Sequence, residues 1–330
     1  MTSPTRSTLK LVAIGGGTGL GTLLRGVKPY LSTESIPGLE LTAIVTVTDD
    51  GRSSGRLRGE FSVLPPGDIR NCLSALADED QIVSHLFRHR FPGGGEIGGH
   101  SLGNLIILAL GQMKGDFLGG IDEARALLGI EARVFPSTLD QVHLVAKMKD
   151  RLVRGQVAIK SEFERIEQLS LSPQDANALP QAVEAIEDAD LITLGPGSLF
   201  TSVIANLLVP GIRDALTRSW AKKIYICNVM TEADETDGFK AIDHLKEIYR
   251  YAPSLKIDVG LFNSAPISAD MRERYAQEKA VLLDPPRDGD HSGTGAQIAA
   301  LPLVSEERVV RHDPWRLSKA ILDLYNGDVS

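Results

Sequence analysis

Short apolar runs alternate with longer amphipathic stretches along most of the chain. The apolar runs are nearly continuous and rich in β-branched residues, and they cover residues 9–14, 41–47, 191–194, 223–229 and 257–262. Such runs are typical of parallel strands buried on both faces. Helical spacing covers residues 22–27, 69–77, 81–90, 102–113, 116–128, 180–188, 199–208, 212–219, 237–250 and 314–325. The alternation predicts an α/β fold with a mostly parallel sheet, whose ligands gather at the carboxyl ends of its strands.

The pattern changes between residues 132 and 171. Residues 142–148 and 152–159 alternate in polarity around a polar turn at Lys149 and Asp150, which predicts a β-hairpin. Residues 163–171 are expected to add a strand. We therefore expect a single domain over residues 1–330, with a β insertion at 132–171 lying on the main sheet.

Composition narrows the class of protein. The chain has 330 residues and a net charge of −8, which gives no general argument for binding nucleic acid or anionic membranes. Cys72 and Cys227 are the two cysteines, too few for a disulfide framework. The polar segment 1–8 lacks the apolar stretch of a signal peptide, and no run of about 18 apolar residues suggests a membrane span. We expect a cytoplasmic protein and, from the general frequency of symmetric assemblies, a homodimer.

A glycine-rich loop follows the first predicted strand and opens a helix. Its residues Gly15, Gly16, Gly17, Thr18 and Gly19 place backbone N–H groups at a helix N-terminus, where the helix dipole favours an anion. The spacing matches neither the dinucleotide fingerprint G-x-G-x-x-G nor the Walker pattern. The loop therefore predicts a phosphate or pyrophosphate site, and it disfavours NAD binding and ATP hydrolysis.

A second loop of the same design follows the strand at 191–194. It consists of Gly195, Pro196, Gly197 and Ser198. Ser198 is either a simple helix N-cap or a ligand for a second phosphate or a sugar. Two such loops in one sheet suit a diphosphate. The surrounding residues do not form the G-x-S-x-G pattern of a nucleophile elbow.

Acidic residues also stand where ligands are expected. Asp49 and Asp50 end the second strand, where carboxylates can hold Mg²⁺, accept from a ribose or act as a base; capping of nearby amides in a solvated turn is the alternative. Asp68 is predicted to be a helix N-cap. The segment 231–237 carries four acidic residues, of which Asp237 is predicted to cap the next helix. The others either face solvent or hold a cation.

Polar residues open two further helices. Arg70 and Asn71 fall in the first turn of the helix that Asp68 precedes, within reach of a phosphate or a base edge. His100 and Asn104 are four residues apart at a helix start, so both can face one site, with His100 a candidate base. A structural histidine is the alternative at His100.

Six motifs together resemble a known family. They are IGGGTGLGTLLRGVK, TDDGRSSGRLR, PPGDIRNCLSALA, GHSLGNL, LGPGSLFTSVIANLLVPGI and NVMTEADETDGF. The chain resembles the bacterial gluconeogenesis-factor family, a relative of 2-phospho-L-lactate transferase, from about residue 9 to residue 324. The resemblance implies a Rossmann-like sheet, a UDP-sugar ligand such as UDP-N-acetylglucosamine or UDP-glucose, and a role in cell shape during growth on gluconeogenic carbon sources, with no established reaction. It also ties Tyr275 and Arg311 to the UDP-sugar, where a tyrosine ring can stack on a base and an arginine can contact phosphate oxygens.

The transferase relatives imply a different activity. They transfer a phospholactyl group from a GDP-linked donor to a deazaflavin with Mg²⁺, and Asp50 matches the position where they hold the deazaflavin. Two interpretations therefore stay open. We predict a UDP-sugar-binding regulator that needs no catalytic residue and acts through unidentified protein partners. The alternative is a transferase that uses Asp49 or Asp50 with Mg²⁺, in which Asp50 is the candidate metal ligand.

Overall fold

The computed structural model describes residues 8–32, 38–162, 164–233, 235–287, 293–306 and 309–328. Most of the polar segment 1–8 and Phe163, at which a strand is expected to begin, lie outside the described residues. Among the described residues the main sheet contains β1 (Lys10–Gly15), β2 (Glu40–Val45), β3 (Arg133–Pro136), β7 (Leu191–Leu194), β8 (Lys222–Ile226), β9 (Val259–Asn263) and β10 (Gln297–Leu301). These strands are all parallel, in the order β10-β9-β8-β7-β1-β2-β3. This order extends the Rossmann arrangement by one strand, which confirms the predicted fold class.

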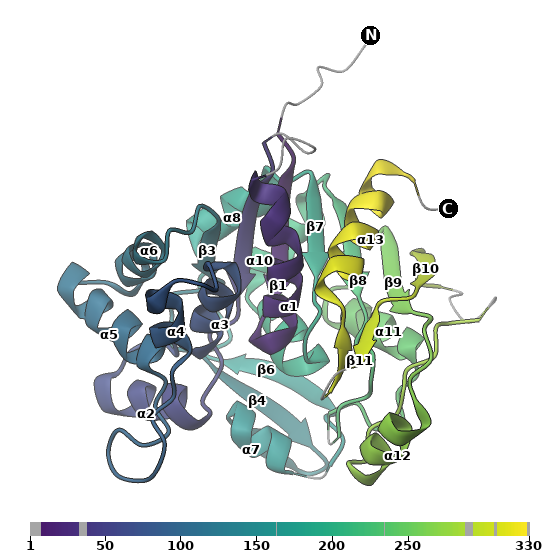
Figure 1. Ribbon diagram of the computed structural model, residues 1–330. Helices are drawn as coiled ribbons and strands as arrows, with labels where there is room; N and C mark the ends of the chain where they lie inside the picture. The colour runs from purple at the N-terminus through teal and green to yellow at the C-terminus, as the bar shows by residue number, and fades with distance from the viewer. Residues whose placement is uncertain are drawn as a thin grey trace.

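Helices cover both faces of the sheet (Figure 1). In chain order they are α1 (Gly17–Val27), the 3₁₀ helix η1 (Lys28–Ser32), α2 (Arg52–Phe61), α3 (Gly67–Leu76), α4 (Ile82–Arg88), α5 (Leu102–Lys114), α6 (Phe117–Leu127), α7 (Gln156–Ser161), α8 (Pro180–Glu187), the π-helix η2 (Leu199–Ile204), α9 (Ala205–Leu207), α10 (Pro210–Arg218), α11 (Ala241–Tyr251), α12 (Ala269–Gln277) and α13 (Pro314–Asn326). Helices α1, α3 and α13 lie on one face, and α8, α10 and α11 lie on the other.

The alternation of strand side chains divides the core into two layers. In β1, Leu11 and Ala13 join the hydrophobic cluster under α1 and α13, whereas Val12 and Ile14 join the cluster under α8 and α10. All four side chains are at most 2% exposed. A strand buried on both faces favours apolar residues on both, which explains the continuous apolar run from Leu11 to Ile14 in β1.

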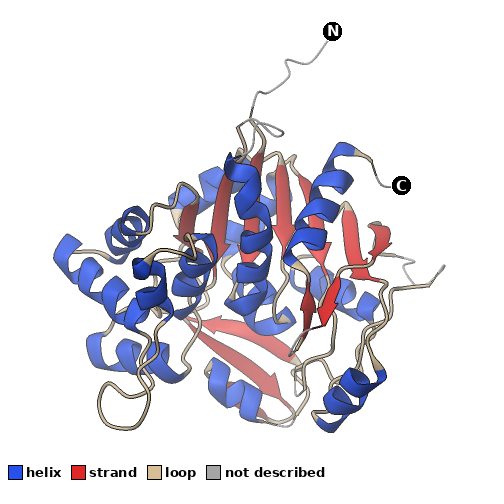
Figure 2. Ribbon diagram, viewed as in Figure 1, coloured by secondary structure: helices blue, strands red, loops and turns tan. Residues whose placement is uncertain are grey.

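The insertion forms a separate antiparallel sheet with two differences from the prediction (Figure 2). Its strands β4 (His143–Met148), β5 (Arg151–Arg154) and β6 (Gln168–Ser172) pair in the order β5-β4-β6 and lie across the carboxyl edge of the main sheet. It begins later than residue 132, because β3 pairs with β2 in the main sheet. Its second strand is also shorter than expected. Gly155, at φ +100°, ends that strand and α7 follows.

The C-terminal part brings distant segments to the same edge. Strands β11 (Val304–Glu306) and β12 (Val310–His312) form an antiparallel pair, and Asp313 then caps α13 through the amides of Trp315 and Arg316. A small apolar cluster that includes Val229, Met230 and Val310 joins this pair to α12 and to the segment after β8.

No single helix among the described residues is long and apolar enough to cross a membrane; one bent pair, Leu199–Leu207 with Pro210–Arg218, passes that test of length and composition.

Candidate ligand-binding site

A cavity of about 310 Å³ lies at the carboxyl ends of β1, β7 and β8. Strands β1 and β7 are neighbours from which the sheet grows in opposite directions, so the cavity occupies the topological switch point where such sheets bind ligands. Its volume lies at the lower end of the range of about 300–1,000 Å³ found for small-molecule sites. Its walls are residues 16–19, 196–198, 228–232 and 310–312, with Thr22, Ser202 and Tyr275.

The first glycine loop presents a helix N-terminus to this cavity. Helix α1 begins at Gly17, inside the glycine run and earlier than the predicted start at Thr22. Gly17 has φ +61°, a left-handed conformation that favours glycine. A Cβ on Gly19 would lie 2.6 Å from the carbonyl oxygen of Pro196, so the two loops touch there. The first-turn amides have no acceptor within the helix, which is the geometry of an anion site.

Asp68 hydrogen-bonds to the first glycine loop instead of capping α3. The N-cap position of α3 is Pro66, and Asp68 lies in the first turn, so the N-cap prediction is wrong. Its carboxylate accepts a hydrogen bond from the backbone of Gly17, and a Cβ on Gly16 would lie only 2.9 Å from its Oδ2 atom. Burial and the nearby Asp49 raise the pKa of Asp68 to about 7. One first-turn amide of α1 therefore has an internal partner.

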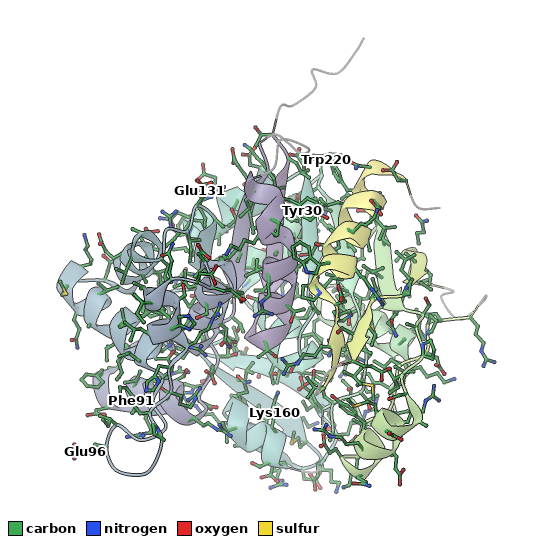
Figure 3. All side chains as sticks on the ribbon, in the orientation of Figure 1. Tyr30, Phe91, Glu96, Glu131, Lys160 and Trp220 are labelled. Atoms are coloured by element: carbon green, nitrogen blue, oxygen red, sulfur yellow. The ribbon has the colours of Figure 1, made fainter. Side chains whose placement is uncertain are left out.

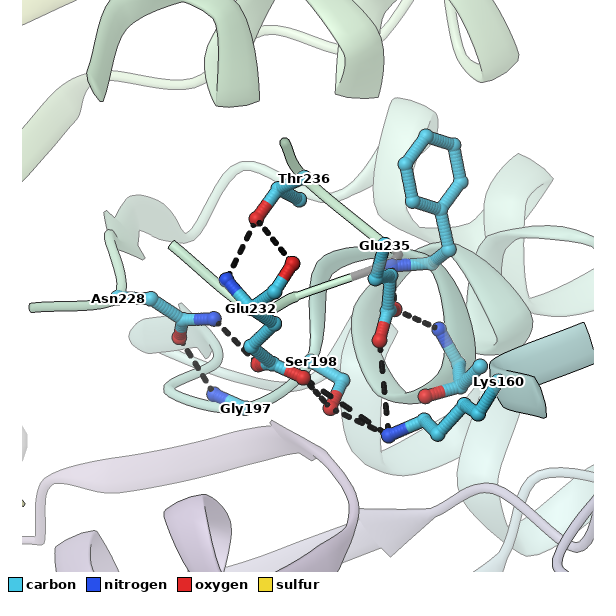
Figure 4. A network of polar contacts seen from close by, with 9 residues as sticks. Lys160, Gly197, Ser198, Asn228, Glu232, Glu235 and Thr236 are labelled. Atoms are coloured by element: carbon cyan, nitrogen blue, oxygen red, sulfur yellow. Dashed lines mark hydrogen bonds and ion pairs between the residues drawn. The ribbon is translucent and has the colours of Figure 1, made fainter. Parts of the chain in front are cut away.

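One carboxylate organises the second glycine loop (Figure 4). Ser198 Oγ donates to Glu232 Oε2 at 2.6 Å, and Asn228 Nδ2 donates to Glu232 Oε1 at 2.9 Å. The Gly197 amide donates to Asn228 Oδ1 at 3.3 Å. Burial and the carboxylate of Glu235 raise the pKa of Glu232 to about 7. Ser198 occupies the N-cap position of η2, but its hydroxyl contacts Glu232 and makes no capping bond to the helix.

A second carboxylate occupies the helix N-terminus of this loop. Glu235 is 5% exposed, and its Oε1 atom accepts from the amides of Phe200 and Thr201 at 2.9 and 3.0 Å. Lys160 of the insertion reaches across, with Nζ 3.5 Å from Glu235 Oε2 and 3.3 Å from Ser198 Oγ. Burial alone would lower the pKa of Lys160, but Glu235 and Glu232 outweigh burial and raise it. These two amides are therefore already engaged, and the prediction of a second phosphate at this loop gains no support from them.

The opposite wall of the cavity combines apolar and polar groups. Tyr275 of α12 is half-buried, and its hydroxyl accepts from the Val310 amide at 3.0 Å, which fixes the ring against β12. The next residue, Arg311, is exposed and lines the cavity. His312 also lines it but is 7% exposed. Both residues that the resemblance tied to a UDP-sugar, Tyr275 and Arg311, thus lie in the same cavity as the first loop.

Asp49 and Asp50 point to different partners. Asp49 Oδ1 accepts from the Gly51 amide at 2.9 Å, and Asp50 Oδ1 accepts from the Val157 amide of α7 at 2.9 Å. Neither lines the cavity, although Asp49 lies beside Asp68. Among the described residues no group of three or more His, Cys, Asp or Glu side chains is placed to hold a metal ion. These bonds correspond to the alternative in which both carboxylates cap nearby amides.

Four other predicted residues meet outside the cavity. Asn104 Oδ1 accepts from Arg70 Nε at 3.2 Å, and Asn71 Oδ1 accepts from Arg70 Nη2 at 2.5 Å. Ser53 Oγ is 2.9 Å from His100 Nδ1 and accepts from Asn104 Nδ2 at 3.1 Å. His100 and Asn104 therefore face one network, as their spacing predicts. The network does not line the cavity, and burial lowers the pKa of His100.

Gly15 is the last residue of β1, and Gly195 directly follows β7. The Gly15 carbonyl accepts from Asn206 Nδ2 at 3.0 Å, and Gly195 has φ +87°. Both glycines shape the loops without lining the cavity.

Sequence reasoning missed several residues of the site. Asn228 opens the NVMTEADETDGF motif but was not singled out, and neither was His312. Lys160 lay between segments 152–159 and 163–171, which were predicted as strands. Glu232 and Glu235 belonged to the acidic run 231–237, for which holding a cation was one alternative. In the structure they hold the ammonium group of Lys160.

Comparisons with known proteins bear on the family and the fold of the chain. The family model described as "2-phospho-L-lactate transferase CofD" matches residues 11–300. A "Putative gluconeogenesis factor" of Nostoc is 44% identical over 96% of this chain and 69% of its own length. A "Gluconeogenesis factor" of Bacillus subtilis is 41% identical over 96% of this chain and 98% of its own length. An X-ray crystal structure of a Bacillus halodurans protein matches with a TM-score of 0.89 and 42% identity, covering 96% of this chain and 99% of that one.

Proposed function

This chain belongs to the gluconeogenesis-factor family, which shares the CofD family model, and we propose that it binds a UDP-sugar such as UDP-N-acetylglucosamine as a regulatory ligand. The observation that carries the proposal is that the N-terminus of α1 lines the same cavity as Tyr275 and Arg311. A helix N-terminus suits phosphate oxygens, and an aromatic ring beside an arginine suits a nucleotide.

The proposal includes a cellular location and partner proteins. The protein acts in the cytoplasm, where its two buried free cysteines stay reduced. Its ligand-bound state is read by partner proteins that maintain cell shape during growth on gluconeogenic carbon sources. The α1 side of the cavity holds the phosphates, and the side near Tyr275 holds the nucleoside.

A Mg²⁺-dependent transferase is the second candidate. The description of the matching family model favours it, as does the position of Asp49 and Asp68 beside the first loop. Two carboxylates are a usual protein contribution to a Mg²⁺ site, and the ion would neutralise phosphate charge there. Asp50 fits such an ion less well, because its carboxylate holds the Val157 amide.

The two candidates differ in the ligand that stabilises the protein. UDP-N-acetylglucosamine should raise the melting temperature, whereas GDP, NAD and ATP should not. At a hundredfold excess over Kd, the gain in free energy of unfolding is about 2.7 kcal/mol. Stabilisation by GDP with a deazaflavin, accompanied by release of GMP from a phospholactyl donor, would overturn the regulator in favour of the transferase.

Arg311→Ala tests the placement of the ligand. The side chain is exposed, so the fold should persist while calorimetry shows weaker UDP-sugar binding, by about tenfold or more for a charged hydrogen bond. The matched control is Arg272→Ala, which removes another exposed charge, on α12 and outside the cavity. Equal losses in both variants would remove Arg311 from the site.

A further inference from the structure

A carboxylate stands in the cavity wall together with the loop that we propose for phosphate. Glu232 lines the same cavity as residues 16–19, and its side chain is 32% exposed. The N-terminus of α1 attracts an anion, whereas a carboxylate close by repels one. The two halves of the wall therefore prefer different parts of a ligand.

Hydrogen bonds hold the Glu232 side chain in one orientation. Its Oε2 atom accepts from Ser198 Oγ at 2.6 Å, and its Oε1 atom accepts from Asn228 Nδ2 at 2.9 Å. The Glu232 backbone amide donates to Thr236 Oγ1 at 2.9 Å. Figure 4 shows the side chain pointing toward Ser198 and Lys160. An acceptor that is already held in place loses little further conformational freedom when a ligand binds.

The carboxylate keeps acceptor capacity for a ligand. An ionised carboxylate offers about four lone-pair sites, and the hydrogen bonds from Ser198 and Asn228 use two of them. Lys160 Nζ lies 3.8 Å from Oε2, which leaves at least one site for another donor. Because the side chain is partly exposed and lines the cavity, a ligand can reach it. Burial and Glu235 raise the pKa of Glu232 to about 7, so at pH 8 the group is mostly ionised.

The charges around Glu232 favour a neutral group over a further phosphate. Lys160 Nζ lies 3.8 Å from Glu232 Oε2 and 3.5 Å from Glu235 Oε2, so one ammonium group serves two carboxylates. Asp68, at the first loop, also attracts Lys160. When ionised, these three carboxylates and one ammonium group carry a net negative charge. A phosphate placed beside Glu232 would be repelled, whereas sugar hydroxyls can donate to the carboxylate.

We propose that Glu232 selects the group beyond the diphosphate, by accepting hydrogen bonds from sugar hydroxyls and by repelling a third phosphate. The inference rests on the proposed function, in which α1 holds the phosphates and the side near Tyr275 holds the nucleoside. Ser198 and Glu232 then line the part of the cavity that the sugar occupies. A UDP-sugar presents hydroxyls after its second phosphate, whereas UTP presents a further negative charge. The site therefore prefers the UDP-sugar, although both ligands share the nucleoside and the first two phosphates.

Glu232→Gln removes the charge while nearly keeping the shape of the side chain. Calorimetry at pH 8 in EDTA compares UDP-N-acetylglucosamine, UDP and UTP in the wild type and the variant. Relative to UDP, the variant should bind UDP-N-acetylglucosamine about tenfold more weakly and UTP about tenfold more tightly. UDP is the reference within each protein, so a general loss of structure cancels from both ratios. Unchanged relative affinity for either the UDP-sugar or UTP would overturn the proposal.

A control variant and deoxy sugars sharpen this comparison. Asp237→Asn removes an exposed carboxylate from the same acidic segment, outside the cavity, and should leave both ratios unchanged. Analogues of UDP-N-acetylglucosamine that each lack one sugar hydroxyl identify the donor. The analogue without it should bind the wild type about tenfold more weakly and lose little further in Glu232→Gln, because both changes remove the same bond. Equal changes in Asp237→Asn, or additive losses with every analogue, would contradict a direct contact.

Two further outcomes separate this inference from its competitors. If the wild type needs Mg²⁺ to bind UDP-N-acetylglucosamine and Glu232→Gln abolishes that need, the carboxylate holds a cation and the inference is wrong. Failure of the wild type to bind any UDP-sugar would instead defeat the proposed function. Pairs of ADP with ATP and GDP with GTP then test Glu232 alone, since the variant should still gain affinity for the triphosphate over the diphosphate. Equal ratios in the two proteins, or no nucleotide binding at all, would overturn the role of Glu232 as well.

Discussion

The two glycine loops look alike in sequence and differ in what meets their helices. Each follows one of the two central strands, β1 or β7, and each leads into a helix. At the first loop, the cavity lies against the N-terminal turn of α1, and Asp68 engages the Gly17 amide. At the second, Glu235 engages the amides of Phe200 and Thr201, and Lys160 balances its charge.

The difference shows what a strand–glycine–helix motif does and does not specify. It specifies a backbone that can hold an anion. Whether that anion is a ligand or a carboxylate of the same chain depends on residues elsewhere, here Glu235 and Lys160. The second loop is thus a wall of the cavity whose helix amides are already bonded, and the first loop is the one that we propose as the anion site. Figure 3 shows Lys160 at this carboxyl edge, far from the fully exposed Trp220 at the other edge.

The largest effect is expected where the two loops touch. Gly19→Ala would place a methyl group 2.6 Å from the Pro196 carbonyl oxygen and 2.8 Å from Gly197, both backbone contacts. The loops must separate, which should cost on the order of 3 kcal/mol of unfolding free energy and abolish detectable UDP-sugar binding. Urea denaturation and calorimetry measure the two effects.

Gly21→Ala is the matched control in the same helix. Its nearest contacts would be 3.6 Å away, so alanine should fit and even stabilise the helix by up to about 1 kcal/mol. Equal behaviour of the two variants would show that the contact between the loops does not define the site.

An intermediate effect is expected from Glu235→Ala. The change exposes the amides of Phe200 and Thr201 and leaves Lys160 with less neutralisation, which should cost about 2 kcal/mol. Glu235→Gln keeps an acceptor for the amides and should cost about half as much. Inorganic phosphate should restore more stability to the Ala variant than to the wild type, since the variant's second loop then becomes an anion site. If phosphate stabilises both proteins equally, the two loops do not differ in the proposed way.

The smallest effect concerns the pH dependence of stability. The carboxyl group of Glu232 has a pKa of about 7 in the folded protein against an ordinary value of 4.5. The unfolded chain therefore binds fewer protons over this interval, and the free energy of unfolding falls as the pH rises from about 4.5 to about 7. Since this side chain is about a third exposed, we expect a contribution on the order of 1 kcal/mol.

Glu232→Gln should remove this part of the pH dependence. Urea denaturation at pH 5 and pH 8 should show a smaller loss in the variant than in the wild type. Asp68 titrates in the same direction and His312 in the opposite one at lower pH, but both are present in the two proteins and cancel in the comparison. If the wild type and Glu232→Gln show an identical pH dependence, the carboxyl group of Glu232 does not have the raised pKa.

The sheet was predictable because burial on both faces leaves a strong local pattern. The strand at 191–194 has the predicted bounds, since a short buried run of three apolar residues and Thr193 leads directly into a glycine turn. Strand β3 was missed because it is short and its register with β2 depends on a distant partner. The helix α7 was missed because alternation continued past Gly155, and the Asp50 carboxylate that caps its Val157 amide lies 107 positions away.

The residues of the site likewise divide into those with a local sequence pattern and those that depend on distant partners. Residues 16–19 carry a local backbone motif and lie where the sequence predicts. The N-cap prediction for Asp68 failed because an aspartate can either cap its own helix or bind the amide of a neighbouring loop, and the sequence does not distinguish the two roles. In the structure the cap position is Pro66, two residues earlier, and Asp68 binds the Gly17 backbone. Lys160 and Glu235 act through partners on other elements, and the sequence around Lys160 does not distinguish a lysine in such a network from one in solvent. Such roles need the folded chain.

The central place of β1 governs when the cavity can first form during synthesis. Leu11 in β1 pairs with Leu191 in β7, and the cavity closes only with β12 near the end of the chain. The first strand to leave the ribosome therefore waits for most of the polypeptide before it gains one of its two neighbours, a non-local arrangement that slows folding. Under the proposed function, chains truncated before β12 should not bind the ligand, because they lack the last wall of the cavity.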